Sequence, residues 1–458
     1  MSEETPPVAR MEAAGRNPGN AGETGTPDSA ALHPGYGTET QIAQLGDVAH
    51  FEMGQSPPSK HVRELDRGLP FLQGNAEFGA IFPAAKLECD APGKVCDAGD
   101  ILISVRAPVG ALNKADKSYC IGRGLAAVSF NNVDSGFGWH MLNYWSPRLR
   151  VVAQGTTFEA VGRKELQQLQ IQLFSVHEQR RIAEILDTLD DAIQKTEQLI
   201  NKLKKIKQGL LHDLLTRGID ENGRLRDPIA HPEQFKDSVL GRIPREWKIV
   251  SLQSTALPGK ENFVDGDWIE APWITDSGIR LIQTGNIGEG QFLDKPEFRK
   301  YISKRSFREL GCRWVHPGDI LICRLAEPIG RACEVPAQVG PSVTAVDCTI
   351  YIPNEKIAVK RFMLHLMNSK AHLRALVNIA GGSTRQRISR GNLGLTPVRI
   401  PRTDEQERII SVLDAHQAKI DAEYANKDKY RELKKGLTHD LLTGKVRVVP
   451  DIMKETVQ

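Results

Sequence analysis

Apolar residues recur at steps of three and four along one long polar segment, residues 178–216. The repeated positions are Ile182, Leu186, Leu189, Ile193, Ile200, Leu203, Leu210 and Leu214, with breaks at Thr196 and Lys207. The residues between them are mostly Glu, Lys, Gln, Asp and Arg, and no proline occurs. This spacing puts the apolar side chains on one face of a helix. It predicts a helix of about 60 Å that needs a partner for its stripe.

The same segment returns without a gap at 405–443. Every position is shifted by 227, so the HDLLT run at 212–216 falls on the same run at 439–443. An internal repeat of this length predicts one structural unit written twice. The second stripe is poorer, because polar or aromatic residues stand where the first copy has Leu189, Thr196, Ile200 and Leu203; these residues are His416, Glu423, Lys427 and Tyr430.

We expect the two helices to pair as an antiparallel coiled coil, because a parallel pair would require the connecting chain to double back along the whole helix. The residues expected at this helix interface or at a docked partner are Ile182, Leu186, Leu189, Ile193, Leu203, Leu210, Ile409, Leu413, Ile420 and Leu437. Gly209 recurs as Gly436, which suggests a close approach or a bend. The His212-Asp213 and His439-Asp440 pairs lack a nucleophile, and we interpret them as helix-end residues.

A body of mixed strand and helix pattern precedes each helix. Both bodies contain a buried-strand pattern after a Gly-Asp turn, in AGDILISVRAPVG and PGDILICRLAEPIG. The predicted fold is mixed α+β, with two similar globular domains separated by two long helices. The predicted segments are a disordered leader 1–37, body 38–176, helix 177–216, linker 217–245, body 246–404, helix 405–443 and tail 444–458.

The spacing between matching turns drifts along the second body. The shift is 211 from Asn75 to Asn286, 219 at the Gly-Asp turn and 227 from the Gly-Thr turn onward. The second body therefore carries insertions, and two similar scaffolds with different loops suggest two sites of the same kind that recognise different things.

Composition narrows the class of protein. The 458 residues carry a net charge of only +3, so overall basicity does not identify a nucleic-acid binder, although basic faces remain possible. The seven cysteines are scattered without a C-x-x-C pair, which argues against a zinc site or a disulfide framework and fits a reduced cytoplasmic setting. We expect no metal ligands, no membrane span and no secretory signal.

The sequence lacks the common catalytic motifs. No phosphate-binding G-x-x-x-x-G-K-[ST] loop, zinc-binding H-E-x-x-H helix, G-x-S-x-G elbow or amino-methyltransferase signature occurs. We therefore expect no catalytic residues in this chain.

Polar residues at matching places in the two bodies are the candidates for DNA contact, because amide side chains read adenine edges and Arg, Lys and hydroxyl groups bind phosphates or guanine. In the first body they are Gln73, Asn75, Arg106, Lys114, Thr156, Thr157 and Lys164. In the second they are Gln283, Thr284, Asn286, Arg299, Lys300, Lys304, Arg305, Arg324, Arg331, Ser383, Thr384, Arg385, Arg387 and Arg390.

Structural explanations remain open for several candidates. Asn75 and Asn286 follow a glycine and could simply serve a turn. The EFRKYISKRSF segment, which contains Arg299 to Arg305, is either a DNA-facing edge or an ordinary amphipathic helix. For any single Arg, a solvated surface charge is the plainer interpretation.

The repeated EQ(R/E)RI…LD…KK…GL…HDLLT pattern after GDILI-containing bodies resembles the specificity subunit of Type I restriction–modification systems. The resemblance covers roughly 40–450. It implies two target recognition domains that read the halves of a bipartite, asymmetric DNA site, and paired helices that set the spacer. It also implies two methyltransferase (modification) subunits that use S-adenosylmethionine, and restriction subunits that use ATP and Mg²⁺; this chain itself would bind none of these cofactors.

Two other classes of function compete with this expectation. A coiled-coil scaffold whose bodies bind proteins would show no salt-dependent affinity for DNA. A stand-alone DNA enzyme would be active as the purified chain.

Overall fold

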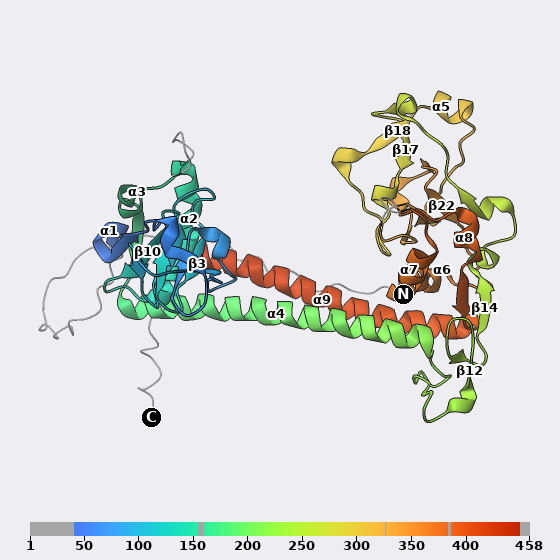
Figure 1. Cartoon of the computed structure of the whole chain (residues 1–458), viewed down its shortest axis with the longest axis horizontal. Helices are drawn as coiled ribbons and strands as arrows, with labels where there is room; N and C mark the ends of the chain where they lie inside the picture. Colours follow the sequence, from blue (N-terminus) through green and yellow to red (C-terminus); the bar gives the residue numbers. More distant parts are fainter. Residues whose placement is uncertain (1–40, 154–159, 326, 383–385, 449–458) are drawn as a thin grey trace, which may run out of the picture. The chain divides into compact units, whose positions relative to one another are not determined.

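The computed structural model describes residues 41–153, 160–325, 327–382 and 386–448, and it divides into two compact units (Figure 1). Unit 1 comprises the chain up to Glu184 together with the segment from Asp440, and unit 2 comprises Ile185–His439. The predicted leader and most of the tail lie outside the described residues. Within the described part of the chain, none of the helices combines the length and apolarity needed to cross a membrane.

Unit 1 contains an inner sheet in the order β2-β10-β7-β8 and an outer sheet in the order β3-β5-β4-β9-β6. The inner strands are β2 (Ala49–Met53), β10 (Leu125–Phe130), β7 (Ile101–Ser104) and β8 (Leu112–Lys114). The outer strands are β3 (Val62–Glu64), β5 (Leu87–Cys89), β4 (Leu69–Leu72), β9 (Tyr119–Ile121) and β6 (Val95–Cys96). The strand β1 (Gln41–Gln44) pairs with β11 (Gln170–Leu173), and the helices are α1 (Leu45–Val48), α2 (Ser135–Ala153) and α3 (Arg163–Gln167).

Unit 2 repeats this plan in β15-β22-β19-β20 and β16-β18-β17-β21. The inner strands are β15 (Phe263–Asp265), β22 (Cys348–Tyr351), β19 (Ile320–Cys323) and β20 (Ala332–Glu334). The outer strands are β16 (Ile274–Thr275), β18 (Lys300–Ile302), β17 (Ile279–Ile282) and β21 (Ser342–Thr344). The strand β14 (Lys248–Ser251) pairs with β23 (Pro397–Ile400), and the helices are α5 (Lys304–Glu309), α6 (Lys360–Met367), α7 (Lys370–Ile379) and α8 (Arg390–Leu395).

The buried-strand prediction after each Gly-Asp turn is confirmed. All four residues of β7 and all four of β19 are buried, as continuous apolar runs require in a covered sheet. The segment YCIGRGLAAVSF, which has the pattern of one strand, is in fact β9 and β10 in different sheets, because the chain turns at Gly122–Gly124. The region 217–245 contains a two-stranded sheet of β12 (Phe235–Lys236) and β13 (Ile243–Pro244) and is more than a linker.

The two repeats form α4 (Val176–Thr216) and α9 (Thr403–Leu442), which pack against each other as an antiparallel coiled coil. Polar contacts give the direction, because the partner number falls as the residue number rises. Asp190 pairs with Lys434, Glu197 with Lys427, and Lys207 with Gln417.

Apolar burial is uneven along this pair. Of the expected interface residues, six are buried and four are half-buried; the buried ones are Ile182, Leu186, Leu189, Ile409, Leu413 and Ile420, and the half-buried ones are Ile193, Leu203, Leu210 and Leu437. Thr196 is also buried, with its hydroxyl donating to the Ala192 carbonyl at 2.7 Å, so this break in the stripe stays inside the pair. Gly209 lies within a continuous α4, and an added Cβ would meet no atom within 4 Å.

Candidate nucleic-acid interface and the helix junctions

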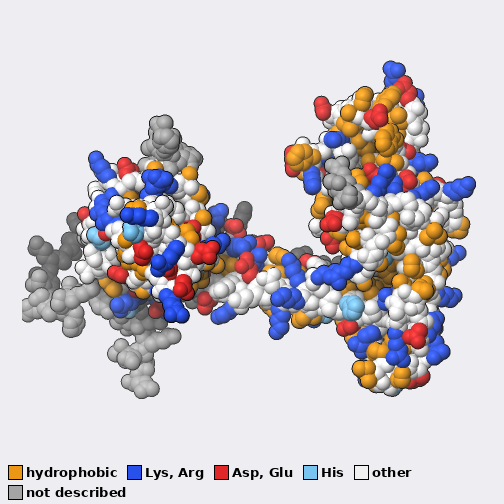
Figure 2. Space-filling model, viewed as in Figure 1, with side chains coloured by type: hydrophobic (Ala, Val, Ile, Leu, Met, Phe, Trp, Pro, Cys, Tyr) orange, Lys and Arg blue, Asp and Glu red, His pale blue; other side chains and the backbone are white. Residues whose placement is uncertain are grey.

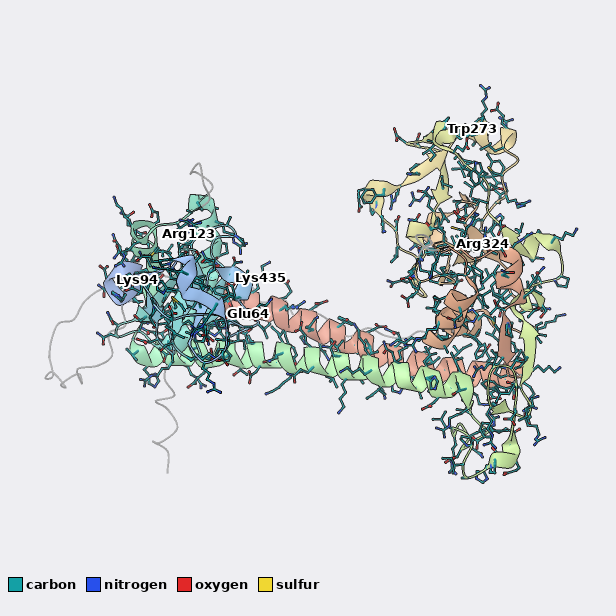
Figure 3. The ribbon with its side chains drawn as sticks, in the orientation of Figure 1. Glu64, Lys94, Arg123, Trp273, Arg324 and Lys435 are labelled. Carbon is teal, nitrogen blue, oxygen red and sulfur yellow. The ribbon has the colours of Figure 1, made fainter. Side chains whose placement is uncertain are left out.

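Three loops of unit 1 meet where its two sheets join. The Gln73 Nε2 donates to Ser56 Oγ at 2.9 Å, and the Arg123 backbone N–H donates to the same oxygen at 3.2 Å. Glycines allow this approach, since a Cβ on Gly122 would lie 2.9 Å from the Gln73 Cα atom, and one on Gly54 would lie 2.2 Å from the Gly122 oxygen. The Gln73 and Arg123 side chains are exposed, and Arg123 is labelled in Figure 3. We call these polar residues loop cluster 1: Gln55, Ser56, Gln73, Asn75 and Arg123.

Unit 2 builds the same meeting point from different side chains. The Asp267 N–H donates to the Thr344 carbonyl at 2.8 Å, as the Gln55 N–H donates to the Ile121 carbonyl at 2.9 Å. Trp268, which takes the place of Ser56, is 66% exposed. We call these residues loop cluster 2: Asp267, Trp268, Gln283, Thr284 and Asp347. The same backbone frame thus presents two different surfaces.

The turn after each Gln shows that the predicted match between Asn75 and Asn286 is wrong. Asn286 Oδ1 accepts from the Gln283 N–H at 3.0 Å, and in unit 1 Glu77 accepts from the Gly74 N–H at 3.2 Å. Asn286 therefore corresponds to Glu77. Asn286 is buried and also donates to the Leu293 carbonyl at 3.0 Å. It therefore stabilises the turn, which was the structural explanation for this residue.

Arg324 is turned inward, which the sequence pattern did not indicate. Its side chain is 3% exposed, and its two terminal nitrogens donate to the Ile388 carbonyl at 2.9 Å and the Val346 carbonyl at 2.6 Å. The equivalent residue in unit 1 is the buried Val105, because the Ile388–Arg324 backbone contact matches that between Val161 and Val105. The predicted match of Arg106 with Arg324 is therefore wrong, and Arg324 braces a loop from inside.

Arg331 and Lys114 also use their charges within their own units. Arg331 donates to the backbone carbonyls of Ile287 at 2.7 Å and Thr284 at 3.0 Å, so it supports the turn that carries Thr284. Lys114 is half-buried, with its ammonium 4.8 Å from the centre of the Trp139 ring. Lys114 lies on β8 opposite Ile101, whereas Arg331 precedes β20, so these two positions do not correspond.

The basic loop of unit 2 has exposed cations at its described end. Arg387 is about half exposed and lies 2.8 Å from Asp347 of loop cluster 2. Arg390 begins α8 and lies 3.9 Å from Asp265. Ser383, Thr384 and Arg385 lie outside the described residues, as do Thr156 and Thr157 of the matching loop in unit 1. In unit 1, Arg106 and Lys164 are exposed.

The EFRKYISKRSF segment is not one amphipathic helix, and the alternative of a DNA-facing edge stays a prediction. It passes through β18 and then enters α5, whose cap is the Ser303 hydroxyl. Its four cationic candidates are all exposed: Arg299, Lys300, Lys304 and Arg305. Arg299 is paired with Asp294 and Arg305 with Glu309, while the face drawn in Figure 2 shows Lys and Arg spread over unit 2 rather than gathered in one patch.

Gln55, Ser56 and Arg123 were not among the residues predicted from the sequence. A signal was present, because Arg123 lies between two glycines and the Gln55-Ser56 pair directly follows Gly54. Polar residues beside glycines are typical of loops that approach another backbone.

The Glu-Gln pair that opens each repeat proves to be a junction. Glu405 is 2% exposed and accepts from the Arg226 guanidinium at 2.5 Å, the Ile219 N–H at 3.0 Å and the Trp247 indole at 3.1 Å. Glu178 accepts from the Arg447 guanidinium at 2.8 Å and the Val448 N–H at 3.1 Å. In each case the chain that leaves one helix binds the glutamate that begins the other helix.

The glutamine beside each glutamate fixes its helix to the preceding domain. Gln179 donates to the Phe174 carbonyl and accepts from the Asp134 N–H, both at 2.8 Å. Gln406 donates to the Pro401 carbonyl at 2.9 Å and accepts from the Val359 N–H at 2.8 Å. These contacts explain physically why the pair occurs twice.

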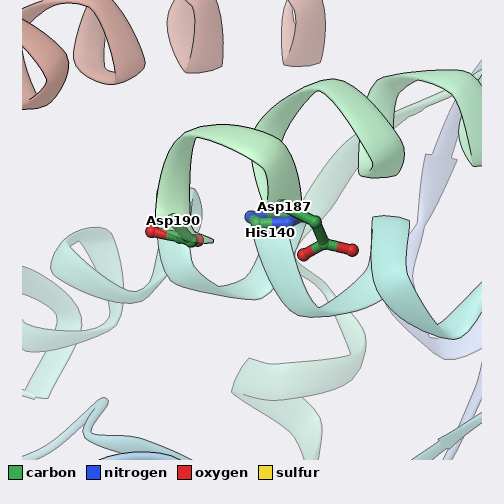
Figure 4. Close-up of side chains that lie close together, drawn as sticks. All are labelled: His140, Asp187 and Asp190. Carbon is green, nitrogen blue, oxygen red and sulfur yellow. The ribbon is translucent and has the colours of Figure 1, made fainter. Parts of the chain in front are cut away.

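Residue types that bind metals occur on α2 and α4 (Figure 4). His140 is buried on α2, and Asp187 and Asp190 lie one turn apart on α4. Asp190 is engaged by the Lys434 ammonium at 2.5 Å, so its charge is used within the helix pair. We assign no metal to these residues.

Comparison with known proteins identifies a family and several similar proteins. The family model described as "Type I restriction modification DNA specificity domain" matches residues 38–205 and 272–430. The putative type I restriction enzyme MjaX specificity subunit of Methanocaldococcus jannaschii is 41% identical over 180 residues, which are 38% of this chain and 42% of that protein. The MjaVIII specificity subunit of the same organism is 24% identical over 417 residues, which cover 89% of this chain and 93% of that one.

A solved structure has the same overall fold. It comes from work on "complex assembly" and "conformational transition of the type I R-M system", has a TM-score of 0.60 and 16% identity, and covers 91% of this chain and 100% of its own. The family match extends over more than half of the sequence and falls on both halves of the internal repeat. The chain therefore belongs to the type I restriction–modification DNA specificity domain family.

Proposed function

We propose that this chain is the DNA sequence-recognition subunit of a Type I restriction–modification enzyme. Each recognition domain reads one half of a bipartite, asymmetric site, and the helix pair sets the distance between the halves. The chain is not itself catalytic and acts through partner subunits in the cytoplasm. S-adenosylmethionine, ATP and Mg²⁺ belong to those partners, which methylate adenine or cleave unmodified DNA.

One observation supports this function above the others: the two domains share strand order while their loop clusters differ. Gln55, Ser56 and Arg123 in the first domain are replaced by Asp267, Trp268 and Val346 in the second. Side chains at groove edges specify bases, whereas a shared backbone frame fixes their placement. Such a pair of domains suits two unlike half-sites.

The helix pair supports the docking of two methyltransferase subunits. Ile206 on α4 is 44% exposed and Leu433 on α9 is 47% exposed, and the shift of 227 relates the two positions. Each lies between half-buried apolar neighbours: Leu203 and Leu210 on α4, and Tyr430 and Leu437 on α9. An exposed apolar residue with half-buried apolar neighbours, at equivalent positions of the two helices, suits two copies of one partner.

A domain exchange tests the reading function. Residues 246–404 are replaced by the equivalent domain of a relative with a known site, and adenine methylation is mapped in cells that supply the partner subunits. We expect one half of the methylated sequence to change and the other half to stay. A change in both halves would contradict independent reading by the two domains.

A pull-down from the native host tests the docking function. We expect an adenine methyltransferase to copurify at about two copies per chain, and the assembly to bind DNA with an affinity that falls steeply with salt. A chain that recovers only unrelated proteins, and shows no DNA affinity with its partners, would instead be a protein scaffold.

A further inference from the structure

A groove of about 560 Å³ lies in unit 2 beside the C-terminal turns of α4. The start of α7 and the strand β23 form its other walls, and the labels α4 and α7 locate these helices in Figure 1. Leu211, Leu215 and Val398 contribute apolar lining. This volume lies in the range of pockets that hold a ligand or a few side chains.

A buried histidine in this groove has an unused polar atom. His372, in the first turn of α7, is 9% exposed, and its backbone N–H donates to the Ser369 hydroxyl at 3.3 Å. Among the described residues, its Nε2 has no hydrogen-bond partner. Burial, assisted by Arg399, lowers the pKa of His372 to about 4, so the ring is neutral at pH 7. A buried polar atom without a partner destabilises the free protein and is uncommon. Because this atom has almost no accessible surface, a group that enters the groove can bond to it only after the ring turns toward the groove.

Gly209 lines the same groove and is equally unexplained within unit 2. Glycine in a helix interior is less stable than alanine, yet an added Cβ would meet no atom within 4 Å. The bend or the close approach expected from the sequence therefore has no counterpart inside the described chain. An absent side chain in an open groove admits the close approach of another backbone.

The charges around the groove favour an acidic occupant. Four cations and one carboxylate line it: Lys205, Lys370, Arg374, Arg399 and Glu289. The Lys370 ammonium donates to Gln208 Oε1 at 3.2 Å, which links α7 to α4 at the rim. The first N–H groups of α7 also lack intrahelical partners and carry partial positive charge.

We propose that this groove seats an acidic segment of the partner subunit. One apolar side chain of that segment lies on the lining, its backbone passes close to Gly209, and a polar group bonds to His372 Nε2 once the ring has turned toward the groove. The inference rests on the proposed function, because it concerns the docking of that partner.

Two substitutions separate docking from stability, with the purified methyltransferase subunit as the probe. His372→Leu removes the unsatisfied buried atom, and Gly209→Ala improves helix propensity. We expect each to raise the thermal unfolding midpoint of the free chain by roughly 2 °C, and to weaken the binding of one of two partner copies by at least about tenfold. Calorimetric titration and sedimentation measure affinity and stoichiometry.

Controls keep the outcomes distinct. Lys370→Glu should weaken the same copy by charge reversal, while Asn201→Leu, at an exposed position of α4 outside the groove lining, should leave binding unchanged. If the wild type binds two copies and the variants do so equally well, the groove inference is wrong while docking stands. If the wild type binds no copy of the methyltransferase subunit, the groove inference and the proposed docking function are both wrong. A lower unfolding midpoint would make His372 and Gly209 structural, and self-association lost in the variants would identify a second copy of this chain as the occupant.

Discussion

The outer sheets of the two recognition domains each contain a buried charged side chain, but the two charges are of opposite sign. In the first domain, Glu88 on β5 is 1% exposed and accepts from the backbone N–H groups of Asp66 and Gly68 and from Arg63. In the second domain the corresponding strand is β18, and the buried charge is Arg280 on β17, which faces Asp294 at 3.5 Å. The outer sheets share the order of four strands but not the buried charge, whereas the inner sheets share both strand order and buried apolar residues.

This contrast indicates where the sequences of the two domains can differ without loss of the fold. The inner sheet is held by apolar packing and backbone pairing, which tolerate only volume-conserving changes. The outer sheet also has apolar clusters and backbone pairing, but each domain adds to it a buried charge whose arrangement differs between the two copies. The loops that join the two sheets can vary in sequence as the outer sheet does, while the inner sheet fixes their position.

The two helix junctions differ in how deeply their Glu–Arg pairs are buried. Glu405 is enclosed with Arg226 and Trp247, both largely buried, whereas Glu178 is paired with an Arg447 that is about one-third exposed. Burial alone would raise the pKa of Glu178, but the Arg447 and Val448 hydrogen bonds outweigh it and lower that pKa. The junction in unit 2 should therefore contribute more to stability.

Replacement of the two glutamates gives the largest expected difference. Glu405→Ala leaves a buried guanidinium without its partner and should lower the free energy of unfolding of unit 2 by about 3–5 kcal/mol. Glu178→Ala should cost about 1–2 kcal/mol, because solvent reaches Arg447. Denaturant unfolding measures both, with the exposed Glu407→Ala as a control. Equal losses at the two positions would contradict the difference between the junctions.

Substitutions in the loop clusters come next. Arg123→Ala should weaken recognition at one half-site and Trp268→Ala at the other, each by about 1–3 kcal/mol in DNA affinity of the assembled complex. Binding to sites that carry single-base changes in either half measures the effect, and the exposed Lys248→Ala on β14 is the control. A variant that weakens binding to all sequences alike would be a backbone contact instead.

The turns after Gln73 and Gln283 allow a finer test of equivalence. Asn286→Ala leaves the Gln283 N–H and the Leu293 carbonyl unpaired and should destabilise unit 2 by about 1–2 kcal/mol. Glu77→Ala, at a half-buried position, should destabilise unit 1 by less than about 1 kcal/mol. Hydrogen exchange at the two turns distinguishes a local loss from a global one. An Asn75 variant that affected its turn more than Glu77→Ala would restore the original match.

Acid titration tests the buried carboxylate of the outer sheet in the first domain. The Asp66 N–H, Arg63 and the Gly68 N–H lower the pKa of Glu88 to about 2 from 4.5. Because the folded pKa lies below the unfolded value, the contribution is complete above pH 4.5 and is lost as pH falls toward 2. Comparison of unfolding at pH 5 and pH 3 should show a smaller loss in Glu88→Gln than in the wild type. The same acid sensitivity in both proteins would exclude Glu88 as its source.

The sequence predicted the long elements well and the local equivalences poorly. The helices α4 and α9 follow from a periodic stripe over many turns, and β7 and β19 from short apolar runs. The matches of Asn75 with Asn286 and of Arg106 with Arg324 failed, because letter identity near an insertion shifts the register. The strand pairs restored it, since one backbone contact fixes the partner of each neighbouring residue.

The candidate site was predicted only in part for the same reason. Gln73 and Arg387 are exposed, but Arg324 has the same charge as Arg387 and points inward. The direction of an Arg side chain depends on which carbonyl groups surround it, and those come from segments far away in the chain. The DNA contacts themselves remain predictions for the tests above.

The sequence by itself determined the internal repeat, the two long helices, their antiparallel pairing and the two mixed domains, because periodic patterns and chain connectivity are local information. Only the tertiary structure decided which loops meet, why each repeat begins with Glu-Gln, and where His372 and Gly209 share a groove. These features join residues tens to hundreds of positions apart. Their geometry arises only when the sheets and helices pack and bring distant polar groups within hydrogen-bond distance.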